Sequence, residues 1–188
     1  SFPGVEVNPT EALLNIIKSN KSHNTTRHKV LPVSFDRVFQ TLAQEVHTHT
    51  PKKLLHLGVA TEAIKFRVET QAFNHIAARV PDIDGRKPQN ARVDRRHPQT
   101  HCLNGSPKAD IIISQLNASG CPASPSTDAG RYVCNALFYS SLAAFGTDLE
   151  VSFIHIPPLG AVFQDQGINH GWTMDSLAAR LQIILDYL

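Results

Sequence analysis

Asp128-Ala129-Gly130-Arg131-Tyr132-Val133-Cys134-Asn135 predicts a short turn that leads a cysteine into the start of an apolar helix. Twenty-one positions later, His155 lies within the apolar run Phe153-Ile154-His155-Ile156-Pro157-Pro158, which predicts a strand. A thiol becomes a strong nucleophile when it is ionised, and a neighbouring imidazole can accept its proton. The two segments therefore indicate a cysteine hydrolase whose nucleophile and base come from a helix and a strand.

Apolar runs and helical patterns alternate along the rest of the chain. Strands are expected at Lys53–Leu57, Ile64–Val68 and Val151–Ile156. Helices are expected from the cap sequence Asn8-Pro9-Thr10-Glu11 onward, and over 35–46, 135–144 and 175–188. This alternation predicts an α/β fold with a largely parallel sheet.

The secondary structure of two further segments is less direct to predict. Asp110-Ile111-Ile112-Ile113 resembles a strand, but the helix start at Ser106-Pro107 and the stop at Gly120 favour a helix between them. Residues 81–106 are rich in Pro, Asn, Asp, Arg and Gly, so they are expected to form a long surface excursion.

Composition sets the protein class. A chain of 188 residues fits a single domain, and 41% hydrophobic with 18% charged residues predicts a folded core. The net charge of +2 gives no indication of nucleic-acid or membrane binding. The basic run 92–96 has no aromatic partners and is expected to be a solvated loop. The sequence does not specify an oligomeric state, and a homo-oligomer is compatible with it.

The chain has three cysteines, Cys102, Cys121 and Cys134, without the spacing of a metal site. An odd number of cysteines fits a reducing compartment, and we expect the cytoplasm. No apolar run approaches the roughly 18 residues that span a bilayer. We expect no metal and no cofactor, and a reduced thiol is required. Cys102 and Cys121 have no identifiable base nearby.

A third residue completes a candidate catalytic set. Glu69 ends the alternating run that begins at Ile64, and its carboxylate is suited to orienting the imidazole of His155. If each residue is considered without the others, His155 is interpreted as a core histidine and Glu69 as a surface residue. With Cys134 at a helix start, where the macrodipole favours a thiolate, the catalytic interpretation is preferred.

The chain resembles the pyroglutamyl-peptidase I family of cysteine peptidases, in motifs that run almost from end to end. These are Phe2-Pro3-Gly4 to Thr10, His56-Leu57-Gly58-Val59-Ala60, Val68-Glu69 with Asn74, Arg79-Val80-Pro81-Asp82, Ala129 to Asn135, and Phe153 to Pro157. Asp128 to Tyr132 and Ile156 to Gly160 look more like eukaryotic members than bacterial ones. The resemblance implies a three-layer α/β/α sandwich of the phosphorylase/hydrolase-like type, and one domain over 1–188 that lacks the family's opening strand.

The resemblance also implies removal of an N-terminal pyroglutamyl residue from peptides through a thioester, with Cys134 as nucleophile, His155 as base and Glu69 as its partner. Four residues are expected to form the walls of a slot for the five-membered ring: Phe2, Val80, Tyr132 and Val133. Asn8 matches a substrate-contacting position and is equally interpretable as the helix cap. Arg79 and the amides near Cys134 are candidates for oxyanion stabilisation.

Val59 stands where many bacterial members have glutamine, which leaves room for two alternatives. One is another triad-type thiol amidohydrolase acting on a different acyl group. The other is a binding module for pyroglutamyl peptides without turnover, motivated by the missing opening strand.

Overall fold

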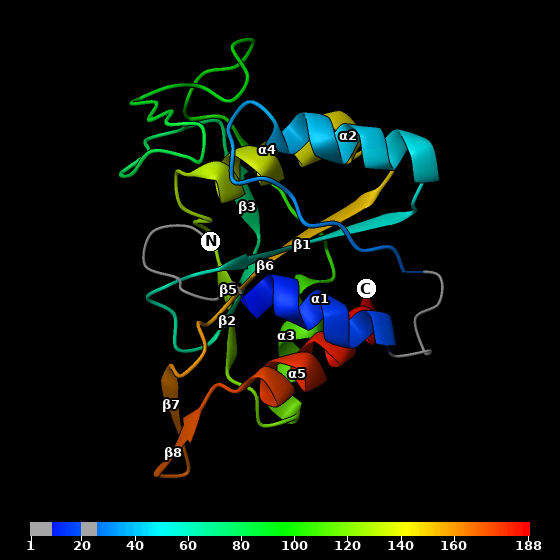
Figure 1. The fold of residues 1–188 in the computed structure, drawn as a ribbon, viewed down its shortest axis with the longest axis vertical. Coiled ribbons are helices and arrows are strands. Elements are labelled where there is room, and N and C mark those ends of the chain that lie inside the picture. The colour runs from blue at the N-terminus through cyan, green and yellow to red at the C-terminus, as the bar shows by residue number, and fades with distance from the viewer. Residues whose placement is uncertain (1–8, 20–25) are drawn as a thin grey trace.

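The fold is given by a computed structural model, which describes residues 9–19 and 26–188, with side chains from Thr10 to Ile17 and from Thr26 onward. Phe2 and Asn8, expected near the substrate, lie outside the described residues. The structure is a three-layer α/β/α sandwich, as expected (Figure 1).

Within the described residues, the central sheet has four strands in the order β1-β6-β2-β5. These are β1 (Lys53–Val59), β2 (Phe66–Glu69), β5 (Ala123–Ser126) and β6 (Glu150–Ile156). β1 pairs with β6 and β2 with β5 in parallel, whereas β2 and β6 are antiparallel. The sheet is therefore largely parallel, with one antiparallel junction at its centre.

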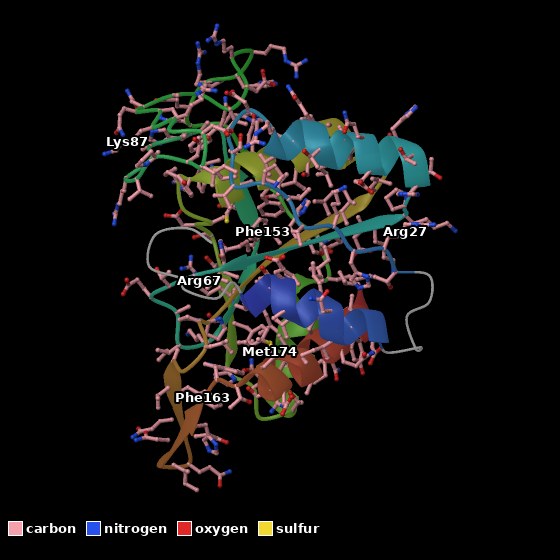
Figure 2. All side chains as sticks on the ribbon, viewed as in Figure 1. Arg27, Arg67, Lys87, Phe153, Phe163 and Met174 are labelled. Atoms are coloured by element: carbon pink, nitrogen blue, oxygen red, sulfur yellow. The ribbon has the colours of Figure 1, made fainter. Side chains whose placement is uncertain are left out.

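Helices of the described segments cover both faces of the sheet (Figure 1). α1 (Pro9–Ser19), α3 (Ala109–Ala118) and α5 (Met174–Tyr187) lie on one face, and α2 (Val38–His49) and α4 (Val133–Phe145) lie on the other. Side chains fill the space between the sheet and both helix layers (Figure 2). On α5, Leu177, Leu181 and Ile184 recur at helical spacing and are buried, and a Thr173–Ser176 capping box fixes its start.

The segment around Asp110–Ile113 is helical, as preferred from the sequence, because it belongs to α3. Its buried residues Ala109, Ile112 and Leu116 lie three and four positions apart, so one helix face packs on the core.

The prediction of a long surface excursion over 81–106 is wrong for the last part of that range. β4 (Cys102–Asn104) lies within that range and pairs antiparallel with β3 (Gln71–Phe73). The loop between them is held by the buried side chain of Asn74, whose amide donates to the carbonyls of Asp94, His97 and Pro98. Long polar side chains on this loop, Lys87 among them, project outward (Figure 2).

A final hairpin extends away from the sandwich (Figure 1). It joins β7 (Val162–Asp165) to β8 (Ile168–Gly171), and its turn residues Gln166 and Gly167 both have positive φ. None of the helices among the described residues is long and apolar enough to cross a membrane.

Candidate active site

Glu69 and His155 meet on neighbouring strands at the centre of the sheet. Glu69 ends β2, and His155 lies on the antiparallel partner β6. The distance from His155 Nδ1 to Glu69 Oε1 is 2.8 Å, and the exposed fractions of the two side chains are 7% and 0%. The carboxylate accepts the Nδ1 proton, which leaves Nε2 facing the other way.

The environment of His155 favours the protonated form of its ring. Burial by itself lowers its pKa, but hydrogen bonds and charge attraction from Cys134 and Glu69 outweigh that effect and raise the pKa to about 9. The Cys134 thiol is therefore close enough to the ring to influence its protonation. The three residues expected to form the catalytic set lie in one chain of contacts.

Cys134 is half-buried and is the second residue of α4. Gly130, with φ of +83°, turns the chain ahead of the helix, and Tyr132 at the N-cap is extended. The thiol therefore lies in the first helical turn, where unpaired backbone amides and the macrodipole favour an anion.

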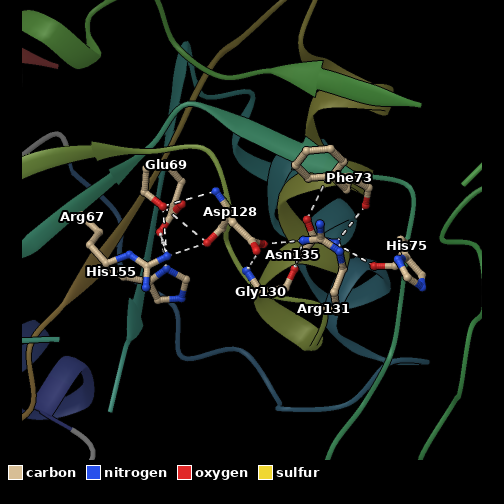
Figure 3. A network of polar contacts seen from close by, with 10 residues as sticks. Arg67, Glu69, Phe73, His75, Asp128, Gly130, Arg131, Asn135 and His155 are labelled. Atoms are coloured by element: carbon tan, nitrogen blue, oxygen red, sulfur yellow. Dashed lines mark hydrogen bonds and ion pairs between the residues drawn. The ribbon is translucent and has the colours of Figure 1, made fainter. Parts of the chain in front are cut away.

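The start of α4 is fixed to β3 by Asn135, whose side chain is fully buried. Its Oδ1 accepts the Phe73 amide at 2.9 Å, and its Nδ2 donates to the carbonyls of Phe73 at 2.8 Å and His75 at 3.0 Å (Figure 3). The amide of Asn135 thus holds the neighbouring Cys134 at a defined place beside the sheet.

Gly58 makes room for the thiol and the imidazole. It lies opposite His155 in the β1–β6 ladder. A Cβ at this position would lie 2.9 Å from His155 Cδ2, 3.1 Å from Nε2 and 3.2 Å from Cys134 Sγ. The Sγ and Nε2 atoms therefore face the same point in space, and a glycine is needed there.

A cavity of about 860 Å³ opens at the thiol. Cys134, His155, Val59, Tyr132 and Val133 contribute to its walls. The cavity continues along β1, where side chains from α1, α2 and α5 line it. It is large enough to receive a peptide terminus at the sulfur.

Of the remaining pocket candidates, Arg79 and Val80 are exposed and are not among the described residues that line this cavity. Tyr132 donates from its hydroxyl to the Pro81 carbonyl at 3.0 Å, which ties this segment to the cavity wall. Burial raises the pKa of the Tyr132 phenol, so it stays neutral.

The other two cysteines have different surroundings. Cys102 is exposed on β4, and Cys121 is buried in the core that contains α3 and α5. Burial raises the pKa of Cys121 to about 12, so its thiol is not ionised at neutral pH. Within the described ranges, no group of three or more His, Cys, Asp or Glu is arranged to hold a metal ion.

Comparison with known proteins gives the same assignment as the site. Residues 1–183 match the family model for pyroglutamyl peptidase, in the C15 group of peptidases. The chain belongs to the pyroglutamyl peptidase family. The resemblance inferred from the sequence motifs is thereby confirmed.

Several members of the pyroglutamyl peptidase family are similar over most of their length. The pyrrolidone-carboxylate peptidase of Pyrococcus furiosus is 31% identical over 186 residues, which cover 97% of this chain and 88% of the relative. That of Thermococcus litoralis is 31% identical over 83% of this chain and 72% of the relative. The crystal structure of pyrrolidone carboxyl peptidase from Thermus thermophilus superposes with a TM-score of 0.86 at 28% identity, covering 100% of this chain and 95% of that one.

The sequence alone did not identify Gly58 and Asn135 as parts of the site. Both lie in quoted motifs, but neither side chain is chemically reactive. The signal for Gly58 was a glycine at the end of an apolar run, and for Asn135 a polar residue in the first turn of a largely apolar helix.

Proposed function

We propose that the protein is a cysteine omega-peptidase that hydrolyses the amide bond after an N-terminal pyroglutamyl residue. The observation that carries this proposal is the contact chain from Glu69 through His155 to Cys134 at the mouth of a cavity, in a chain of the pyroglutamyl peptidase family. We assign Cys134 as nucleophile, His155 as base and then acid, and Glu69 as the residue that orients His155.

The reaction has two stages. The Cys134 thiolate attacks the pyroglutamyl carbonyl carbon, and the C–N bond breaks as His155 Nε2 gives its proton to the leaving amine. This stage releases the shortened peptide and leaves a thioester on the sulfur. His155, now neutral, takes a proton from water as the water oxygen adds to the thioester carbonyl. The C–S bond then breaks, so that pyroglutamate is released and the Cys134 thiolate is restored beside protonated His155.

The backbone amides at the start of α4 are the proposed donors to the oxyanion in both stages. They lie in the first helical turn with Cys134, and no side chain of the described residues caps the helix start. Such pre-oriented donors stabilise the negative charge that develops on the carbonyl oxygen. Val59, Tyr132 and Val133 are the proposed walls around the acyl group, since they share the cavity with the thiol.

The environment of the protein follows from the same chemistry. A working thiolate must stay reduced, so we propose a reducing compartment, the cytoplasm, and a requirement for reducing agent without any cofactor. Its partners are peptides with N-terminal pyroglutamate.

The test uses a fluorogenic pyroglutamyl amide with the wild-type protein, Cys134→Ala and Cys102→Ala. We expect turnover to be lost in Cys134→Ala and kept in Cys102→Ala, because Cys102 is exposed on β4 and is not among the described residues that line the cavity. Turnover retained in a clean Cys134→Ala preparation would refute the nucleophile assignment.

Competition separates pyroglutamyl hydrolysis from hydrolysis of another acyl group. Free pyroglutamate and 2-pyrrolidone should inhibit the wild-type protein, because both present the five-membered lactam to the cavity. Absence of inhibition, together with turnover of a different acyl amide, would instead assign the site to another substrate.

A further inference from the structure

Arg67 links the buried acid to the turn that leads to the nucleophile (Figure 3). Its Nη2 donates to Ser126 Oγ at 2.9 Å and to the Asp128 carbonyl, and it lies 3.5 Å from Glu69 Oε1. One nitrogen of the guanidinium thus contacts oxygens from three residues.

The position of Arg67 in the sheet explains these contacts. It lies directly opposite His155 in the β2–β6 ladder and two residues before Glu69. Residues opposite one another or two apart on a strand project from the same face of the sheet. Arg67, Glu69 and His155 therefore share the face on which α4 presents Cys134.

Asp128 connects Arg67 to the turn that precedes Cys134. Its carbonyl accepts from Arg67, and its side-chain Oδ1 accepts the Gly130 amide at 2.9 Å and pairs with Arg131. Arg131 in turn lies over the Phe73 ring, 4.5 Å from its centroid. The turn before α4 is therefore fixed on one side through Arg67.

Arg67 also balances the charge of the buried Glu69 carboxylate. The Glu69 carboxylate is completely buried, and within residues 9–19 and 26–188 its ion-pair partners are His155 and Arg67. In the proposed reaction His155 gives up its proton, so at that stage Arg67 is the positive charge left beside the carboxylate. A buried carboxylate without a cation is costly and tends to take up a proton.

We propose that Arg67 is a positioning residue that keeps Glu69 ionised throughout the cycle and aligns it with the turn before Cys134. This role rests on the proposed function, because it concerns the acid that orients the catalytic base. Arg67 keeps this charge at every working pH, since a guanidinium does not lose its proton in proteins.

Other ionisable groups border the site on each packed element. From β1, His56 is buried and its pKa is lowered by burial to about 4, so it is neutral. From the segment before α4, Asp128 is paired with Arg131, and the Tyr132 phenol is neutral. His56 and the Tyr132 phenol therefore keep one charge state between pH 5 and 8.5, which is the range of the test.

The test compares Arg67→Gln and Arg67→Met with Arg67→Lys, which keeps the charge. The readout is the rate of iodoacetamide alkylation at Cys134 against pH, followed by mass spectrometry of the peptide that contains it. Arg96→Gln is the matched control, because it removes one arginine charge from a surface pair with Asp94. Melting temperatures identify which variants are folded.

We expect either folded neutral variant to move the midpoint of the alkylation profile up by roughly 0.5 to 1 pH unit, because removing a nearby cation disfavours the anionic site. Arg67→Lys and Arg96→Gln should keep the wild-type midpoint. The acidic limb of kcat/KM on the pyroglutamyl amide should move with it. A wild-type midpoint in a folded neutral variant, or an equal shift in Arg67→Lys, would overturn the proposal.

The alkylation readout needs no substrate, so the two proposals can fail separately. If the wild-type protein does not cleave pyroglutamyl amides but the midpoint still shifts, the role of Arg67 stands and the proposed substrate does not. If cleavage occurs and the midpoint does not shift, the proposed substrate stands and the role of Arg67 does not.

Discussion

His155 and Glu69 are joined by a 2.8 Å hydrogen bond from Nδ1 to Oε1, and both side chains are almost completely withdrawn from solvent. This bond fixes which ring nitrogen faces the sulfur. It also places an anion beside the ring, so the imidazolium persists in a buried position that would otherwise exclude it. The strand pairing between β2 and β6 thereby sets the protonation state of the base.

Glu69→Gln should lower kcat/KM by roughly 10²- to 10⁴-fold, because the neutral amide no longer holds the ring as an imidazolium. The pKa of His155, raised to about 9 in the wild-type protein, should fall. The alkaline limb of the pH profile should therefore move to lower pH. Steady-state kinetics from pH 6 to 10 measure both effects, and an unchanged alkaline limb would contradict the assigned role.

Gly58→Ala should reduce activity by at least about tenfold, since the added methyl group occupies the space between thiol and imidazole and overpacking costs roughly 1–3 kcal/mol. Its Cβ would lie 3.1 Å from His155 Nε2 and 3.2 Å from Cys134 Sγ. Gly171→Ala is the control, because a Cβ there meets no atom within 4 Å. Equal activity of the two variants would show that Gly58 does not shape the site.

His56 makes the fold sensitive to acid. It is buried on β1, hydrogen-bonds Ser141 at 3.0 Å, and burial lowers its pKa to about 4. The unfolded chain therefore takes up a proton near pH 6.5 that the folded protein accepts only near pH 4, so stability falls as the pH drops through this window. Between pH 7.5 and pH 5 this group should cost roughly 2 kcal/mol.

His56→Gln removes the contribution of this histidine to the pH dependence of stability. The loss of unfolding free energy between pH 7.5 and pH 5 should therefore be smaller by roughly 2 kcal/mol than in the wild-type protein. Urea unfolding at the two pH values measures it. His47→Gln, a change of an exposed histidine on α2, is the control and should keep the wild-type dependence. If His56→Gln loses as much stability as the wild type, another group is responsible.

The sequence predicted most helices and the long strands, because their apolar residues follow a clear period. It did not predict β5, which is four residues long and contains Pro125. Proline is tolerated there because β5 lies at the edge of the sheet. The antiparallel pairing of β2 with β6 is a contact between distant segments, and no local pattern encodes it.

Prediction of the site was similarly uneven. Cys134, His155 and Glu69 were identified because their side chains carry chemistry, and the structure brings them together. Arg67 alternates with the apolar residues of the run that begins at Ile64, and nothing in the sequence assigned it to the site. It lies instead beside the acid, because the face of β2 that carries it is covered by the turn before α4.

Asn135→Ala should destabilise the fold by about 2–4 kcal/mol, because the buried Phe73 amide and two carbonyls lose their partner. The side chain of Asn135 makes hydrogen bonds of 2.9, 2.8 and 3.0 Å to these groups. Activity should fall further than the folded fraction does, since Cys134 would lose its anchor to β3. Chemical unfolding and kcat/KM on the same samples measure the two effects, with Asn169→Ala on the exposed face of β8 as control. Activity that falls only in proportion to unfolding would limit Asn135 to a structural role.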